Sequence, residues 1–332
     1  MKTILEVRDL ETTFKQRKTR IHAVNGVSFT LKKGEMLGVV GESGCGKSVS
    51  MLSIVNLLPP AATIENGQVM FDGKDIRKMT RRQVQHIRGK KIGMIFQDPM
   101  TSLNPVMKIG TQMIEALRYH NKLSKEAALD RSAELLELVG ISNPRERLNE
   151  YPHQLSGGMR QRVMIAMALT CDPEVLIADE PTTALDVTIQ AQIVELIKDL
   201  RSKLDSSIIL ITHDLGLIAG MVDRIIVMYS GYIVEEALVD ELYKNPSHPY
   251  TMGLLQSIPK LRGSTVARLS SIDGSPPDLL EKPSFCPFAP RCKFSIERCW
   301  KENPGLTLVE PEKDDGAHKV ACWVDTKTGE AR

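Results

Sequence analysis

A glycine-rich octapeptide constrains this chain more than any other feature. Residues Gly41–Ser48 read GESGCGKS and fit the P-loop pattern G-x-x-x-x-G-K-[ST] at every fixed position. The apolar run Met36–Val40 predicts a buried strand entering the loop, and Val49–Leu58 predicts a helix leaving it that stops at Pro59–Pro60. Glycines let a backbone wrap an anion, and a helix N-terminus adds positive potential. The stretch therefore predicts a nucleotide-phosphate site.

The roles within this loop follow from the side chains. Lys47 is expected to reach the β- and γ-phosphates of ATP, and the Ser48 hydroxyl is expected to hold Mg²⁺. The residues expected to contact the nucleotide here are Ser43, Gly44, Cys45, Gly46, Lys47, Ser48 and Val49.

Length and composition limit the number of domains, the possible partners and the expected location of the chain. A chain of 332 residues suggests two domains, or one large domain with an appendage. Lys and Arg number 43 against 41 Asp and Glu, and this near balance argues against a nucleic-acid partner. Charged residues such as Glu6 and Arg8 interrupt any signal peptide, and no apolar run approaches the length of a membrane span. We expect a cytoplasmic protein, soluble or peripheral on a membrane.

Three further apolar runs end in polar side chains. Gln97 follows Ile92–Phe96, Asp179 and Glu180 end the run from Val175, and His213 follows Ile208–Thr212. The carboxyl ends of strands in open α/β sheets meet at the ligand crevice. Asp179 is expected to orient Mg²⁺ and Glu180 to act as general base for water. Gln97 could coordinate Mg²⁺ or the attacking water, but taken alone it is better read as a solvated loop residue. His213 could contact the γ-phosphate, but taken alone it is better read as a structural histidine.

A second anion site is predicted within a mainly helical stretch, about 98–165. Ser156-Gly157-Gly158 opens a helix over Met159–Leu169, and the two glycines leave backbone N–H groups bare at its N-terminus. Ser124 is expected to cap an earlier helix that Gly140 ends. Near the start, residues 4–35 predict antiparallel strands around a charged hairpin tip. Phe14, beside that tip, is either an adenine-stacking ring or ordinary core.

In this order, the motifs resemble those of ABC-transporter nucleotide-binding proteins over residues 1 to about 240. By that resemblance Gln97 is the Q-loop glutamine, Ser156–Gly158 the signature, Ala184–Asp186 the D-loop and His213 the switch histidine, while Phe14 falls at the adenine-stacking position. Met159 departs from the glutamine usual in the signature. The segment 96–105, FQDPMTSLNP, and the tail motifs SHPYT (247–251) and CPFAPRC (286–292) are similar to the peptide/nickel importer group.

The resemblance implies an α/β fold: a P-loop NTPase (RecA-like) core with an antiparallel β subdomain and an inserted α-helical subdomain, plus an irregular Cys-rich C-terminal extension. The ATPase domain would span 1–240 and the extension 241–332. Such a chain would bind and hydrolyse ATP to power import of di- or oligopeptides, or alternatively of nickel or another small solute. Its catalytic residues would be Glu180, His213 and Gln97, and Gln97 would join Ser48 at Mg²⁺.

Partners follow from the same resemblance. Two ATPase chains, alike or different, would dock head to tail, so that Ser156, Gly157 and Gly158 reach the ATP held by the partner chain. The pair would work with two transmembrane permease subunits and an extracytoplasmic solute-binding protein, at the cytoplasmic face of the cell membrane.

Four of the six cysteines crowd the tail with the spacing Cys286-x5-Cys292-x6-Cys299-x22-Cys322. The tight C-x2-C pairs usual for zinc are absent, and looser spacing suits a [4Fe–4S] cluster with four Cys ligands. The family resemblance points the same way. Zn²⁺ and free or partly paired thiols are the alternatives.

Two other classes of ABC protein are excluded by organisation. Chromosome-maintenance ATPases insert a long coiled coil between P-loop and signature, but residues 49–154 show no sustained heptads. Translation factors of this superfamily carry two cassettes in one chain, and this chain has one.

Overall fold

The structure, a computed structural model, describes residues 2–17, 19–183, 185–203, 205–258, 272–310 and 318–332. The chain forms two compact units, each considered by itself below. The first unit joins residues 1–77 to 212–332, and the second is the segment 78–211 between them. The predicted boundary near residue 240 falls inside the first unit and stays a prediction.

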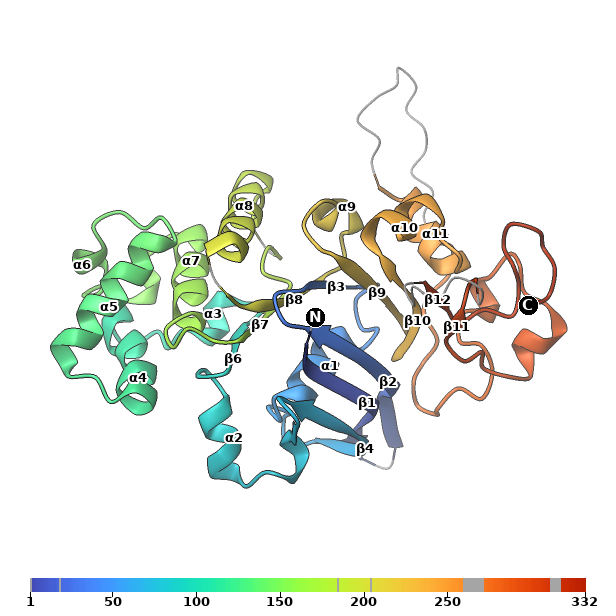
Figure 1. The fold of residues 1–332 in the computed structure, drawn as a ribbon, viewed down its shortest axis with the longest axis horizontal. Coiled ribbons are helices and arrows are strands. Elements are labelled where there is room, and N and C mark those ends of the chain that lie inside the picture. The colour runs from blue at the N-terminus through green and yellow to red at the C-terminus, as the bar shows by residue number, and fades with distance from the viewer. Residues whose placement is uncertain (1, 18, 184, 204, 259–271, 311–317) are drawn as a thin grey trace, which may run out of the picture. The chain divides into compact units, whose positions relative to one another are not determined.

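The first unit contains an antiparallel sheet in the order β2-β1-β4-β5 (Figure 1). Its strands are β1 (Thr3–Gln16), β2 (Thr19–Lys32), β4 (Ala62–Phe71) and β5 (Lys74–Asp75). The turn between β1 and β2 lies within the charged segment 15–20, and Gln16 pairs with Thr19. The antiparallel strands predicted for residues 4–35 are thereby confirmed.

The second sheet of this unit carries the P-loop. Strand β3 (Met36–Val40) is buried at all five positions, and it pairs in parallel with β9 (Arg224–Tyr229). Antiparallel neighbours follow in β10 (Tyr232–Leu238), β12 (Lys319–Val320) and β11 (Thr307–Leu308). Burial on both faces explains why β3 is a continuous apolar run.

The helices of the first unit are short. They are α1 (Lys47–Ile54), η1 (Ile76–Lys78, at the border of the unit), α9 (Leu215–Ile218), α10 (Val239–Lys244), α11 (Pro249–Gln256), η3 (Ala289–Arg291) and η4 (Glu297–Trp300). The predicted helix over Val49–Leu58 is wrong in its end: α1 stops at Ile54, and Asn56 takes the left-handed conformation with φ 53°. The described residues beyond α11 form turns, these two 3-10 helices and two short strands.

The second unit has a parallel core of β6 (Ile92–Ile95), β7 (Val175–Asp179) and β8 (Ser207–Thr212), whose last residue belongs to the first unit. Its helices are α2 (Arg81–Ile87), α3 (Pro99–Ser102), α4 (Ile109–Asn121), α5 (Lys125–Leu138), α6 (Pro144–Arg147), η2 (Pro152–Gln154), α7 (Gly157–Ala168) and α8 (Val187–Lys203). Elements α3 to α7 occupy the stretch predicted to be mainly helical (Figure 1).

Local capping accounts for the helix ends in this unit. The Ser124 hydroxyl accepts a hydrogen bond from the Ala127 N–H at the start of α5, and Gly140 has φ 75° just beyond its end. Leu117 of α4 and Ala128 of α5 are buried in a small apolar cluster with Ile114. Among the described residues, no helix has the length and apolar character to cross a membrane.

Candidate functional site

The P-loop backbone depends on two glycines. Gly41 has φ 153° and Gly46 φ 100°, in the region that side chains disfavour. A Cβ at Gly41 would lie 2.2 Å from the Met228 carbonyl oxygen, and one at Gly46 would lie 2.3 Å from the Ala23 carbonyl oxygen. The loop therefore packs against β9 at Gly41 and against β2 at Gly46, at distances that only glycine allows. Between them, Ser43 and Gly44 are exposed.

Lys47 begins α1 and folds back over the loop. Its side chain is buried, and Nζ donates to the Gly41 carbonyl at 2.8 Å and to the Glu42 carbonyl at 3.0 Å. The ammonium is thus held at the mouth of the loop, and the next residues, Ser48 and Val49, are half-buried. A glycine cradle, a helix N-terminus and a positioned cation fit the triphosphate of a nucleotide.

Cys45 lies inside this cradle as a buried thiol, 3.9 Å from Lys47 Nζ. Burial raises the pKa of Cys45, and the Lys47 charge opposes that shift. The side chain packs inside the loop, and the predicted contact of Cys45 with the nucleotide stays a prediction.

Phe14 lies in β1, where it pairs with Ile21 of β2 and Ala62 of β4. Its ring is half-buried, so one part of it packs and another part is accessible. The adenine-stacking role of Phe14 stays a prediction.

Two carboxylates end strand β7 in the second unit. Asp179, the last residue of the strand, and Glu180 are both buried. Glu180 has φ 44°, a left-handed conformation uncommon for a residue with a side chain, and its N–H donates to the Ile211 carbonyl at 3.0 Å. Strain of this kind is frequent where a side chain must be aimed into a site.

Gln97 is brought to Glu180, as expected if both act on one substrate. Gln97 is exposed just beyond β6, and its Nε2 donates to Glu180 Oε2 at 3.2 Å. Thr183 donates its hydroxyl to the same oxygen at 2.8 Å. Thr183 was missed by the sequence reasoning, and its position three residues after Glu180 is the only signal that points to it.

The signature glycines open a helix, as predicted, although α7 begins two residues earlier than Met159. The Ser156 hydroxyl accepts from the Met159 N–H at 3.3 Å, and Ser156 and Gly157 are exposed. Further along α7, Gln161 donates to the Pro181 carbonyl at 2.6 Å. This contact ties the signature helix to the residue after Glu180. Ala184 of the predicted D-loop lies outside the described residues.

His213 is exposed in the first unit, directly after β8, and the following Asp214 caps α9. Its predicted role as a γ-phosphate sensor stays a prediction, as do the metal roles of Ser48 and Gln97.

The P-loop has supports that sequence reasoning missed. Tyr250 Oη accepts a hydrogen bond from the Glu42 N–H at 2.7 Å, and Arg291 forms an ion pair with the Glu42 carboxylate at 2.7 Å. Both partners belong to the tail motifs SHPYT and CPFAPRC, which were noted for their resemblance and given no role.

The four tail cysteines are not arranged as predicted. Within the described ranges, no group of three or more His, Cys, Asp or Glu side chains is placed to hold a metal ion. Burial, together with the neighbouring thiols of Cys299, Cys322 and Cys292, raises the pKa of Cys286 to about 12. Burial likewise raises the pKa of Cys292 to about 11. These values describe the thiols without a metal, and the metal role of the four cysteines stays a prediction.

Comparison with known families gives two matches along the chain. A family described as ABC transporter matches residues 24–183, and one described as oligopeptide/dipeptide transporter, C-terminal region, matches residues 234–299.

Individual relatives are similar over nearly the whole length. The oligopeptide transport ATP-binding protein OppD of Bacillus subtilis is 52% identical over 97% of this chain and 88% of its own. The dipeptide transport ATP-binding protein DppD of the same organism is 50% identical over 99% of this chain and 97% of its own.

Among solved structures, a dimeric post-hydrolysis state of the ATP-binding cassette MJ0796 with ADP and Pi aligns with a TM-score of 0.64 and 29% identity, over 71% of this chain and 99% of that one. A cbiO1 structure from Clostridium perfringens aligns with a TM-score of 0.62 and 28% identity, over 74% of this chain and 92% of that one.

Proposed function

Because the chain belongs to the ABC-transporter ATP-binding proteins of the oligopeptide and dipeptide transport group, we propose that it powers import of di- or oligopeptides by binding and hydrolysing ATP. The observation that carries the peptide assignment is the match at residues 234–299, because this region lies outside the cassette shared by all ABC transporters. The relatives named for oligopeptide and for dipeptide transport are almost equally similar, so the proposal covers both substrates.

In the proposed ATP site, Lys47 and the loop N–H groups hold the phosphates, and Ser48, Asp179 and Gln97 serve Mg²⁺. Bound Mg²⁺ would neutralise charge that develops on the phosphates. Glu180 orients and activates the attacking water, while His213 and Gln97 respond to the γ-phosphate. Support comes from the buried Lys47 beside the Gly41 carbonyl and from the Gln97–Glu180 hydrogen bond.

The working site is proposed to be shared between two ATPase chains. Ser156 and Gly157 are exposed at the N-terminus of a 12-residue helix, which suits them to an anion brought by a partner chain. The dimeric MJ0796 structure is consistent with such an arrangement. The partner chain is either a second copy of this chain or a related ATPase.

Transport needs further subunits under this proposal. They are two transmembrane permeases and an extracytoplasmic solute-binding protein, with this chain at the cytoplasmic face of the membrane. Coupling to the permeases would run through the helices after Gln97, which begin with α3. No nucleic-acid partner is proposed, because charge is nearly balanced over the chain.

The four tail cysteines are proposed to take up a [4Fe–4S] cluster, with Zn²⁺ as the alternative. Support comes from their number and spacing, and from thiols close enough to raise one another's pKa. Metal loading would require loss of the thiol protons and a rearrangement into ligand geometry. Iron, acid-labile sulfide and zinc are measured on anaerobically purified protein. About four irons and four sulfides per chain would support the cluster. One zinc per chain would support the zinc alternative. Protein that contains neither iron nor zinc would refute both proposals.

The transport function is tested in a strain that lacks the gene and needs an amino acid for growth. Growth on that amino acid supplied as a peptide should fail, and the wild-type gene should restore it while Glu180→Gln should not. Growth on the free amino acid is the control. Unimpaired growth on dipeptides and oligopeptides, with loss of cellular nickel instead, would favour the nickel alternative.

The dimer is tested by size exclusion of the Glu180→Gln protein with ATP, alone and mixed with the second ATPase of its transporter. A dimer of this chain alone indicates a homodimer. A dimer only in the mixture indicates a heterodimer, and a monomer in both refutes the shared site.

A further inference from the structure

Glu42 carries an acidic side chain within a loop whose ligand is anionic. It lies second in the P-loop and is half-buried, with its carboxylate in the same loop as the exposed Ser43 and Gly44. Its carbonyl oxygen accepts from Lys47 Nζ at 3.0 Å, so the placement of Glu42 also places the phosphate-binding lysine. An unpaired carboxylate here would repel phosphate and loosen the loop.

Arg291 pairs with this carboxylate through both of its terminal nitrogens. Nη1 donates to Glu42 Oε2 at 2.7 Å and Nη2 to Oε1 at 3.0 Å, the bidentate geometry that gives arginine–carboxylate pairs their strength. The hydrogen bond to Glu42 raises the pKa of Arg291, so the cation is permanent.

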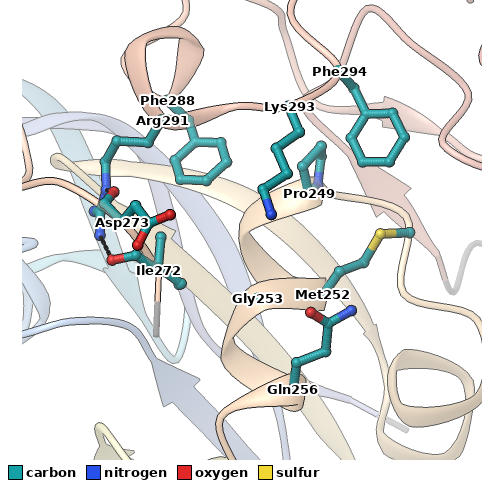
Figure 2. Close-up of a pocket in the computed structure, with 10 residues that line it drawn as sticks. All are labelled: Pro249, Met252, Gly253, Gln256, Ile272, Asp273, Phe288, Arg291, Lys293 and Phe294. Carbon is teal, nitrogen blue, oxygen red and sulfur yellow. Dashed lines mark hydrogen bonds between the residues drawn. The ribbon is translucent and has the colours of Figure 1, made fainter. Parts of the chain in front are cut away.

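The guanidinium is itself held in place. Nε donates to the Asp273 carbonyl at 2.9 Å, and Nη2 donates to the Ile272 carbonyl at 3.1 Å, as Figure 2 shows for Ile272. The central guanidinium carbon, Arg291 Cζ, lies 5.8 Å from the centre of the Tyr229 ring. The Arg291 side chain is only 4% exposed, against 28% for Glu42.

Arg291 also borders a cavity. Together with Pro249, Met252, Phe288 and Lys293 it lines a cavity of about 280 Å³ between α11 and the segment 286–294 (Figure 2). Polar contacts hold the arginine beside this cavity, and because its side chain is nearly buried, the thermal midpoint is measured together with KM.

We propose that Arg291 is a positioning residue of the ATP site, which neutralises Glu42 and holds the P-loop in its phosphate-binding shape. The C-terminal extension thus completes the nucleotide site from outside the cassette. Tyr250 assists by accepting the Glu42 N–H at 2.7 Å. This inference rests on the P-loop binding ATP, but not on which solute is transported.

The test compares Arg291→Gln, Glu42→Gln and the double variant in the full chain, with KM for ATP, kcat and the thermal midpoint measured for each. Arg291→Gln should raise KM about tenfold, because an unpaired carboxylate beside the phosphates costs roughly one power of ten in affinity. Saturating ATP should restore most of kcat. Glu42→Gln should hold or lower KM, and the double variant should recover to within about threefold of wild type.

A matched control is Lys282→Gln. Lys282 also links the extension to the body of the unit through an ion pair, with Glu11 at 2.7 Å, but it does not touch the P-loop. Its KM should equal that of wild type.

An unchanged KM in Arg291→Gln would overturn the proposal. The proposal would also be overturned if the double variant had the same raised KM and the same lowered thermal midpoint as Arg291→Gln. That result would show that the contact of Arg291 is purely structural. Lys47→Ala separates these outcomes from failure of the ATP site itself, because it should abolish nucleotide binding whatever the role of Arg291.

Discussion

Gln97 and Glu180 are joined by a hydrogen bond of 3.2 Å from the side-chain amide to Oε2 of the carboxylate. The same oxygen accepts the Thr183 hydroxyl at 2.8 Å, so two donors fix one edge of the carboxylate. The strained backbone of Glu180, with φ 44°, adds a third constraint. In the proposed role of general base, a carboxylate that is pre-oriented in this way would lose little freedom when water and nucleotide arrive.

Glu180→Gln is expected to retain ATP binding and to lose turnover. The amide keeps the size of the side chain but cannot accept a proton, and general-base catalysis is worth about 10²–10⁴ in rate. Steady-state ATPase rates and a nucleotide titration check this, with the wild type measured in parallel. Near-normal turnover would remove Glu180 from the catalytic role.

Thr183→Val is expected to lower kcat about fivefold and to leave ATP affinity unchanged. The substitution keeps the shape of the side chain and removes one hydrogen bond to the base, which is worth about 1 kcal/mol. Thr183→Ser is the matched control, because it keeps the hydroxyl and should retain most of the rate. If both variants behave alike, the hydroxyl does not orient Glu180.

Gly46→Ala is expected to abolish ATP binding and to lower the thermal midpoint. Its φ of 100° disfavours a side chain, and the new Cβ would lie 2.3 Å from the Ala23 carbonyl oxygen. Gly73→Ala is the control: it also has a positive φ, 77°, but nothing lies within 4 Å of its Cβ. That control should cost about 1 kcal/mol of stability and keep nucleotide binding. Equal effects on binding would refute the steric argument.

Acid should destabilise the first unit through His248. This residue caps α11, where Nδ1 accepts the Tyr250 N–H at 3.1 Å and must be unprotonated. Burial lowers the pKa of His248 to about 4, while the nearby Glu235 carboxylate acts in the opposite direction. In the unfolded chain the pKa is about 6.5. The unfolded state therefore binds more protons between these values, and stability falls by about 3 kcal/mol as pH drops from 6.5 to 4.

The measurement is the thermal midpoint of wild type and His248→Asn at pH 7.5 and pH 4.5. Asparagine can cap the helix but does not titrate in this range, so wild type should lose more stability than the variant. If the thermal midpoints of wild type and His248→Asn differ by the same amount at both pH values, His248 is not the source of the destabilisation by acid.

Much of the candidate site could be predicted because its parts are local. The P-loop, the strand before it and the glycine-opened helix α7 are encoded by contiguous residues, and apolar runs mark the strands that end near Gln97 and Glu180. The end of α1 was misjudged because Pro59–Pro60 sets an outer limit, whereas the chain turns earlier at Asn56. Thr183 was missed because a threonine that follows a strand occurs in many structural contexts and does not by itself indicate a contact with a carboxylate.

The supports of Glu42 were beyond the reach of local patterns. Tyr250 is separated from Glu42 by 208 positions and Arg291 by 249, and nothing in either segment marks a partner in the P-loop. The cysteines show a different limit of sequence patterns. Their spacing predicts ligands, but it does not give the arrangement of the side chains, so the cluster stays a proposal that metal analysis tests.

The first unit is assembled from both ends of the chain, with residues 78–211 inserted between them. During synthesis, β3 emerges from the ribosome long before β9, its parallel neighbour, and before Arg291. The inserted unit can therefore complete its own core before β3 gains its neighbour β9. A nascent chain halted before residue 212 would carry the whole P-loop motif and its contact at Ala23 of β2, but would lack the contacts at Met228 of β9 and at Arg291, so the complete loop forms only late in translation.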